Sequence, residues 1–507
     1  MQQTILKHLQ TWFVTSDKTH QVIATLALCS IVGISGGALF AFLGPLLAIA
    51  LIAALVGGLF MLRNTQLTLF ALVGAICLLP FAALPTAGIG FSPTLLDLIL
   101  VVLLLTWLFK LARRKRDSLR STSLDALIVA FMIVICASFV MGLSFGSLTT
   151  NLLRHFAELL LSIFLFFLVI NNVRTQEHLG QIITVLILAG FAASLIGTVL
   201  YFLPQDLTIR LLSALRVVRY PAGSAVLRFV ENNPELPLRA TSTSIDPNVL
   251  GGLLVIVMAV TVPQFLTPDP LPPFDLGGRR WGINWLVMPV LIVMSLCLLL
   301  TFSRGAMAGL VVALVVLALL RHRRLLVFIL LAGAALLLLP QTQWYVQHSV
   351  EGLMRQDLAT QMRLGEYKDA LILISRHPWF GVGFAEAPDI DTYIGVSSLY
   401  LLMAEEIGII GLCLFLLIVG LAVMLMLRGL KRLAHNPRLE SILLGLLTAL
   451  LGALFSGLLD HYFFNINFQH AVALFWLCLG LGVASTLVPS GSEAPAPLPG
   501  EAAPAPT

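Results

Sequence analysis

WLVMPVLIVMSLCLLLTFSRGAMAGLVVALVVLALL, residues 285–320, decides the fold of this protein. The stretch is apolar on both sides of the turn Ser303-Arg304-Gly305, and each side approaches the roughly 17–25 residues of a membrane-spanning helix. Two membrane helices joined by a polar turn are the simplest structure for such a sequence. Arg304 is also the first indication of a site, because a cation at membrane depth is rarely kept without a function.

The whole chain has the composition of a polytopic membrane protein. It is 59% hydrophobic and 11% charged, with a mean hydropathy of +0.98, which excludes an ordinary soluble domain. We predict an all-α membrane helix bundle of about 14 helices, or 12 to 14 because the first two apolar runs lie nearly together. The predicted spans are 22–40, 43–62, 67–84, 94–111, 124–141, 156–170, 182–203, 249–266, 285–302, 306–320, 325–339, 399–427, 442–459 and 472–487.

Basic residues predict the orientation of these spans. If the N-terminus is cytoplasmic, the strong basic clusters at 110–116, 279–280, 321–324 and 428–432 all lie inside, as does Arg174. The segments 204–246 and 341–397 are then the main external loops. We therefore predict a multi-pass transmembrane domain at 1–487, with the N-terminus and the C-terminus in the cytoplasm. Residues 1–20 lack a cleavable signal pattern, so the first span should remain as an anchor.

The remaining composition predicts neither a cofactor nor a metal. All six cysteines fall within apolar runs, and their spacing suits neither a metal site nor a disulfide framework. The net charge of +5 is small, and its placement in short loops indicates a lipid bilayer rather than a nucleic acid as the partner. The segment 488–507 is rich in Pro and Ala, and we predict a disordered cytoplasmic tail.

Four arginines fall outside the predicted cytoplasmic clusters: Arg154, Arg239, Arg304 and Arg363. A guanidinium presents a fork of donors that suits phosphate oxygens, and it stays charged. Arginines that converge on one pocket would therefore bind a diphosphate. The alternative is that they snorkel or pair locally, and Glu158 is well placed for Arg154 at i,i+4.

Three further groups admit both a functional and a structural interpretation. Asp246, followed by a proline and an asparagine, is a good helix cap, although free amides at a helix start also bind anions. Trp379 suits either the membrane interface or stacking on a sugar. His461, beside Asp460, is either a general base or a structural histidine at the interface.

Several motifs, taken in order, resemble the O-antigen ligase and O-antigen polymerase superfamily of bacterial inner-membrane proteins. They are Arg239 with the Asp-Pro-Asn segment at 246–248, Thr-Phe-Ser-Arg-Gly-Ala at 301–306, Arg363 followed by His-Pro-Trp-Phe-Gly-Val-Gly at 377–383, and Tyr-Leu at 400–401 with Glu-Ile-Gly-Ile-Ile-Gly at 406–411. The resemblance covers roughly residues 154–480.

The resemblance implies a metal-independent glycosyltransferase of the bacterial cytoplasmic membrane. Such enzymes act at its outer face on a glycan linked to undecaprenyl diphosphate, and the acceptor is a glycan, a lipid or a protein. Arg239, Arg304, Arg363 and Arg154 would hold the diphosphate. Trp379 and Tyr400 are candidates for contact with the glycan or the acceptor.

The expected catalytic base is missing. The ligase pattern has His-Asn just before the Tyr-Leu pair, and here Ser397 and Ser398 occupy those positions. This departure favours a polymerase or a divergent transferase, or a chain whose catalytic base comes from elsewhere, such as His461 or Glu405. Histidine is the first choice, because imidazole accepts protons near neutral pH.

Two other classes of function fit the same composition. A transporter or flippase for an anionic or lipid-linked solute would also place arginines in a membrane cavity. A scaffold in an envelope complex would not need the arginines. The sequence leaves open the choice between polymerase and ligase, and the identity of the glycan and acceptor.

Overall fold

The computed structural model describes residues 60–83, 92–113, 119–273, 284–338, 358–385 and 395–489, with scattered positions in 22–58 and 343–354. The chain divides into two units, Met1–Asn64 and Thr65–Thr507. The predicted spans at 22–40 and 43–62 and the predicted tail at 488–507 lie almost wholly outside the described residues.

In its described residues, the second unit is built of helices and one short strand pair. Its elements are α3 (Thr65–Leu78), α4 (Leu95–Arg113), α5 (Asp125–Gly142), α6 (Thr150–Asn172), α7 (Gln176–Phe202), α8 (Gln205–Ala214), η1 (Leu215–Val218), η2 (Gly223–Val226), β1 (Arg228–Phe229), η3 (Val230–Asn232), β2 (Leu238–Arg239), α9 (Pro247–Leu266), α10 (Val287–Leu300), α11 (Arg304–Leu320), α12 (Leu325–Leu338), α14 (Leu358–Arg376), α15 (Leu399–Glu406), α16 (Gly408–Leu433), α17 (Pro437–Ser456) and α18 (Gln469–Leu487). The strands β1 and β2 pair antiparallel, and Arg228 lies opposite Arg239.

The predicted all-α membrane bundle is confirmed. Within the described part of the chain, seven helices are long and apolar enough to cross a membrane, and five shorter helices are also apolar. Every predicted span from 67–84 onward overlaps one of the observed helices. The exact number of spans stays a prediction, because the apolar stretches of these five helices have only 10–17 residues.

One predicted span is wrong as a single helix. The segment 399–427 is divided into α15 and α16 at Ile407. Gly408 has a φ of 72°, a left-handed conformation that glycine adopts without the penalty of a β-carbon. A β-carbon there would lie 2.5 Å from the main-chain nitrogen of Phe380, so the break lets another segment approach closely.

The centre of the unit consists of α18, α17 and α9. Helix α18 is buried along almost its whole length and packs against α6 and α17, while α9 packs against α17 and α11. Small residues permit the close contact of α11 with α17: a β-carbon at Gly309 would lie 2.7 Å from the carbonyl oxygen of Gly452. Such small-residue contacts are typical of membrane helix pairs, and this one holds the helix that begins with Arg304.

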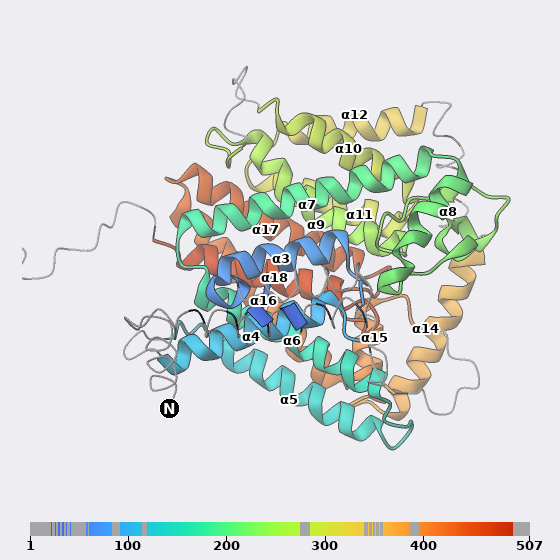
Figure 1. Ribbon diagram of the computed structural model, residues 1–507. Coiled ribbons are helices and arrows are strands. Elements are labelled where there is room, and N and C mark those ends of the chain that lie inside the picture. Colours follow the sequence, from blue (N-terminus) through green and yellow to red (C-terminus); the bar gives the residue numbers. More distant parts are fainter. Residues whose placement is uncertain are drawn as a thin grey trace, which may run out of the picture. The chain divides into compact units, whose positions relative to one another are not determined.

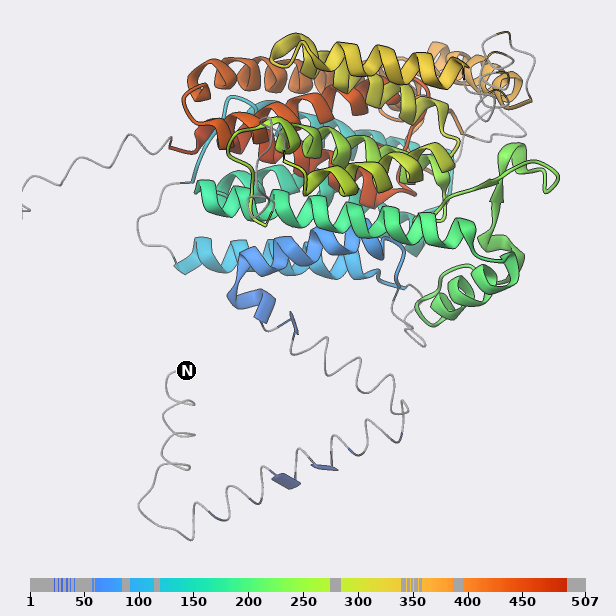
Figure 2. The same ribbon diagram turned by 90° about the horizontal axis from the view of Figure 1, so that it is seen from above.

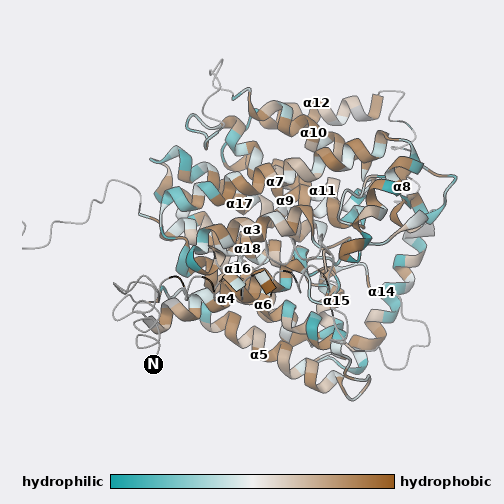
Figure 3. Ribbon diagram, in the orientation of Figure 1, coloured by the Kyte–Doolittle hydropathy of each residue, from teal (hydrophilic) through white to brown (hydrophobic). Residues whose placement is uncertain are grey.

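The helices of the second unit run side by side (Figures 1 and 2). Helices α8 and α14 lie at one end. At the other end, Arg321 forms an ion pair with Glu440 at 3.2 Å, and Arg438 forms one with Asp269 at 2.7 Å. Hydrophilic residues gather toward these ends and apolar residues lie between them (Figure 3). The described basic residues that we predicted to be cytoplasmic thus lie at one end of the bundle, and the described parts of the predicted external loops lie at the other. Which end faces the cytoplasm stays a prediction.

Candidate functional site

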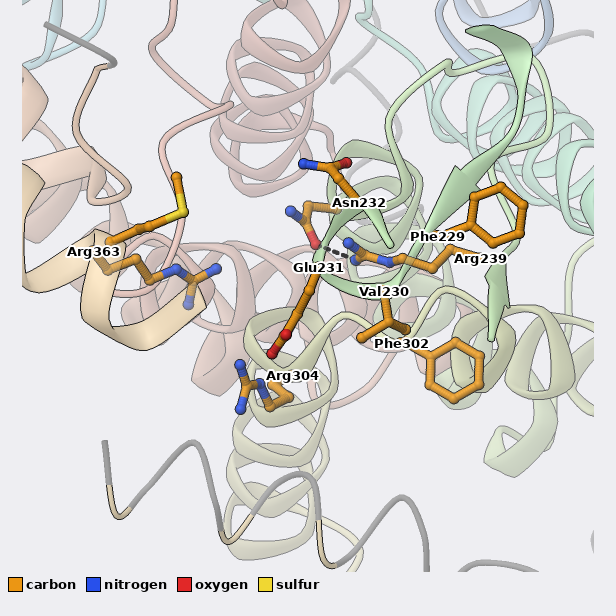
Figure 4. A pocket seen from close by; sticks show the side chains of 10 residues that line it. Phe229, Val230, Glu231, Asn232, Arg239, Phe302, Arg304 and Arg363 are labelled. Atoms are coloured by element: carbon orange, nitrogen blue, oxygen red, sulfur yellow. Dashed lines mark hydrogen bonds between the residues drawn. The ribbon is translucent and has the colours of Figure 1, made fainter. Parts of the chain in front are cut away.

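An arginine-lined cavity lies at the end of the bundle formed by the predicted external loops. It has a volume of about 180 Å³, and Arg239 from β2, Arg304 from α11 and Arg363 from α14 all line it. These three segments are far apart in the sequence, and the fold brings their guanidinium groups around one space (Figure 4). The other lining residues are Phe229, Val230, Glu231, Asn232, Asn248, Phe302 and Met362.

Arg239 is held in position by two short hydrogen bonds. Its Nε donates to the carbonyl oxygen of Thr301 at 2.7 Å, and its Nη2 donates to Oδ1 of Asn248 at 2.7 Å. Asn248 is in turn positioned by the start of α9, where Asp246 Oδ1 accepts from the main-chain N–H groups of Asn248 and Val249 at 2.7 and 3.1 Å. The Asp-Pro-Asn segment therefore caps α9 and also orients Arg239.

Arg304 is the first residue of α11. A cation at this position is electrostatically unfavourable, because the start of a helix carries a partial positive charge. The same two charges favour an anion in front of the helix. The turn before Arg304 is closely attached to the strand pair, since the N–H of Ala240 donates to the carbonyl oxygen of Leu300 at 2.8 Å.

Arg363 reaches the cavity from α14, whose position is set by contacts with the start of α15. The N–H of Ser397 donates to Oε2 of Glu366 at 2.9 Å, and the hydroxyl of Tyr367 donates to the carbonyl oxygen of Ser397 at 3.1 Å. Burial raises the pKa of Tyr367, so this hydroxyl stays a donor. Glu366, the carboxylate nearest to Arg363 in sequence, is thus engaged with a main-chain amide.

Arg154 does not line this cavity. Its Nη1 lies 2.8 Å from Oδ2 of Asp97 and 3.6 Å from Oε2 of Glu158, and the Glu158 side chain is almost fully buried. The local pairing with Glu158 that the sequence suggested is present, and Asp97, from α4, adds a partner that sequence spacing does not indicate. The structure therefore gives Arg154 an evident role in joining α4 to α6.

His461 and Asp460 lie between α17 and α18, outside the residues that line the cavity. Nδ1 of His461 is 3.6 Å from Oδ1 of Asp460, which also accepts the N–H of His461 at 2.9 Å. Burial raises the pKa of Asp460, while the nearby charges of His461 and Arg363 act in the opposite direction. Asp460 is therefore close enough to Arg363 to influence the cavity electrostatically.

Glu405 is buried in α15 and does not line the cavity. Its carbonyl oxygen accepts the N–H of Val382 at 2.8 Å, and the neighbouring carbonyl of Glu406 accepts the N–H of Gly383 at 3.0 Å. A β-carbon at Gly381, whose φ is 69°, would lie 2.5 Å from the carbonyl of Glu406. The glycine-rich motif thus forms a close main-chain contact that joins the end of α14 to the break between α15 and α16.

The two predicted aromatic contacts lie apart from the cavity lining. Trp379 lies in the glycine-rich turn at 377–383 and is 65% exposed, so its indole is available to membrane or glycan. The hydroxyl of Tyr400 donates to the carbonyl oxygen of Leu454 at 2.8 Å, which joins α15 to α17.

Sequence reasoning missed three polar groups of the cavity: Glu231, Asn232 and the side chain of Asn248. Glu231 follows β1, and Figure 4 shows its carboxylate pointing toward the guanidinium of Arg304. The available signal was the polar turn Glu-Asn-Asn-Pro-Glu at 231–235 between two arginine-containing segments, which is typical of a hairpin.

The described residues contain no group of three or more His, Cys, Asp or Glu side chains arranged to hold a metal ion. A bundle of apolar helices, with three arginines around one cavity at one end, defines a polytopic membrane protein.

The comparison with known families is more specific. Residues 289–416 match the family model described as O-Antigen ligase, which confirms over that segment the resemblance inferred from the motifs. The match includes Arg304, Arg363 and the glycine-rich turn, whereas Arg239 and His461 lie outside it. No curated protein matched the chain.

Proposed function

We propose that this protein is an integral-membrane glycosyltransferase of the O-antigen ligase and polymerase type. It transfers or polymerises a glycan from an undecaprenyl-diphosphate-linked donor at the outer face of the cytoplasmic membrane. The observation that carries the proposal is the cavity on which Arg239, Arg304 and Arg363 converge. Arg239 is preset for ligand binding by its two 2.7 Å hydrogen bonds.

The chemistry of the donor matches this arrangement. When the glycosidic bond to phosphate breaks, negative charge develops on the departing diphosphate. Preorganised guanidinium groups stabilise that charge more strongly than they stabilise the intact donor, which is the requirement for catalysis. Arginine suits this role better than lysine, because its planar fork binds two phosphate oxygens at once.

The cavity size supports a diphosphate as the group bound. Its volume of about 180 Å³ is below the range of about 300–1,000 Å³ that is typical of pockets enclosing a whole small-molecule ligand. A diphosphate head group requires less space, with the isoprenoid extending into the bilayer and the glycan into solvent.

A transfer assay with reconstituted protein tests the proposal. The donor is an oligosaccharide on a polyprenyl diphosphate, and the acceptors are a second lipid-linked repeat, a glycolipid and a peptide. Arg304→Ala should lower kcat by about 10²–10³-fold, the usual loss when one group that stabilises the transition-state anion is removed. Arg304→Lys should recover little of the rate.

Arg210→Ala is the matched control, because Arg210 is an exposed arginine on α8 at the same end of the bundle. Its transfer rate should equal that of the unmodified protein. Near-normal product from Arg304→Ala would refute the proposal. Movement of the labelled lipid across the bilayer without transfer would identify a flippase instead.

A further inference from the structure

A carboxylate occupies the arginine-lined cavity. Among the described residues that line the cavity, Glu231 is the acidic one. Its side chain points toward the guanidinium of Arg304 from α11 (Figure 4), and Arg239 from β2 and Arg363 from α14 line the same cavity. A carboxylate in a cavity that binds an anionic donor repels that donor and weakens its binding. Its presence there is therefore explained best by a separate function in the reaction.

The main chain at Glu231 is held in an uncommon conformation. Glu231 and Asn232 have φ values of 53° and 55°, in the left-handed region that residues with a β-carbon seldom adopt. The turn persists because the N–H of Val230 donates to the carbonyl oxygen of Pro237 at 3.1 Å and the N–H of Asn233 donates to the carbonyl oxygen of Val230 at 3.0 Å. Strain of this kind concentrates at functional sites.

The acceptor hydroxyl requires a group that takes its proton. Ser397 and Ser398 stand where the ligase pattern has His-Asn, and neither serine lines the cavity. The two bases suggested by the sequence, His461 and Glu405, also lie outside the lining residues. Glu231 is already beside the arginines that would hold the leaving group.

We propose that Glu231 is the general base that activates the acceptor hydroxyl, an inference that rests on the proposed function. The acceptor oxygen attacks the anomeric carbon of the donor sugar, and a new glycosidic bond forms. The bond from that carbon to the phosphate oxygen breaks, and its electron pair leaves with the diphosphate, held by Arg239, Arg304 and Arg363. The hydroxyl proton passes to the Glu231 carboxylate, which later releases it to water.

A counterion role for Glu231 makes a different prediction. If the carboxylate only neutralised Arg304 until the donor displaced it, its removal would strengthen donor binding and leave the rate of the chemical step unchanged. If Glu231 is the base, its removal lowers the rate of the chemical step by about 10²–10⁴-fold, the usual contribution of general base catalysis.

The experiment compares Glu231→Gln with Glu235→Gln. Glu235 lies on the same turn, is exposed and does not line the cavity, so it controls for the loss of one negative charge. Single-turnover transfer is measured across pH, and binding of the donor lipid is measured on the same preparations. We expect Glu231→Gln to bind the donor at least as well as the unmodified protein, to transfer about 10²–10⁴-fold more slowly, and to lose the acidic limb of the pH profile. Glu235→Gln should match the unmodified protein.

Added formate provides a second readout. It should restore part of the activity of Glu231→Ala, because a small carboxylate can occupy the vacated position, and it should not rescue Arg304→Ala. Donor binding by Glu231→Gln shows that this variant is folded. If Glu231→Gln fails to bind the donor, the test uses Glu231→Asp and Glu231→Ala instead. Glu231→Asp should transfer faster than Glu231→Ala, because it keeps a carboxylate.

Near-normal or faster transfer by Glu231→Gln would overturn the assignment. Absence of formate rescue together with equal rates for Glu231→Asp and Glu231→Ala would also overturn it. Failure of the proposed function is distinguishable, because then the unmodified protein itself would transfer no glycan. Loss of transfer in Arg304→Ala with normal transfer in Glu231→Gln would keep the function and reject the base.

Discussion

Gly408→Ala should destabilise the protein strongly. Gly408 has a φ of 72°, and an added β-carbon would lie 2.5 Å from the main-chain nitrogen of Phe380. The left-handed conformation alone costs about 1–2 kcal/mol for a residue with a β-carbon. The main chains of the two segments would also have to separate to admit the methyl group.

That separation breaks three main-chain hydrogen bonds. The N–H groups of Val382, Gly383 and Ile409 donate across this contact at 2.8, 3.0 and 2.8 Å. Each contributes about 0.5–1.5 kcal/mol net. Together with the backbone conformation, the expected loss is about 3–6 kcal/mol of unfolding free energy.

Thermal denaturation of the detergent-purified protein measures the effect. Gly420→Ala is the control, because Gly420 lies within α16 and a β-carbon there meets no atom within 4 Å. That variant should keep its melting temperature or gain slightly, since alanine favours a helix by about 0.5–1 kcal/mol. If Gly408→Ala melts at the same temperature as Gly420→Ala, the reasoning on the glycine contact is wrong.

Three other substitutions have defined outcomes. Arg154→Ala should lower the unfolding free energy by about 3–5 kcal/mol, because it leaves Glu158 and Asp97 without their shared cation; an unchanged melting temperature would contradict this. Burial raises the pKa of Asp460, so the ionised carboxylate lowers the stability of the folded state. Asp460→Asn should therefore raise the melting temperature at neutral pH. That gain should disappear as the pH falls toward the ordinary aspartate pKa of about 3.9, where the carboxyl is protonated in both states; a gain that is equal at all pH values would contradict the assignment. Ser397→Ala should change the transfer rate less than twofold, which corresponds to roughly 0.4 kcal/mol, because the contacts made by Ser397 come from its main chain. A large loss of rate would instead indicate a catalytic role for the Ser397 side chain.

Hydropathy located the long apolar helices from α3 onward, because lipid selects such segments whatever their tertiary contacts are, but it did not locate α8 and α14, which lie in the predicted external loops. It did not predict the break before Gly408, which depends on the approach of Phe380 from a distant segment. It also did not indicate the strand pair β1–β2, which has two residues on each side. Such a short pair persists only because the bundle supports it.

The sequence predicted those residues of the candidate site that are charged and lie within or beside apolar segments. Arg304 stands out in that way, and the structure places it around one cavity with Arg239 and Arg363. Arg154 gave the same signal, and local spacing indicated its partner Glu158 but not its partner Asp97, which is on another helix. The polar turn at 231–235 indicated a hairpin, but it did not show that Glu231 enters the cavity, because that position depends on how the turn folds.

The attachment of the three arginines has an evolutionary consequence. Arg239 and Arg304 belong to one block, because the strand pair is bonded to the turn between α10 and α11. Arg363 comes on a separate helix, which is tied to the start of α15 by bonds to the main chain of Ser397. A change in α14 would therefore leave intact the hydrogen bonds that hold Arg239 against the turn before Arg304. Selection can thus act on the helix that carries Arg363 separately from the block that carries Arg239 and Arg304.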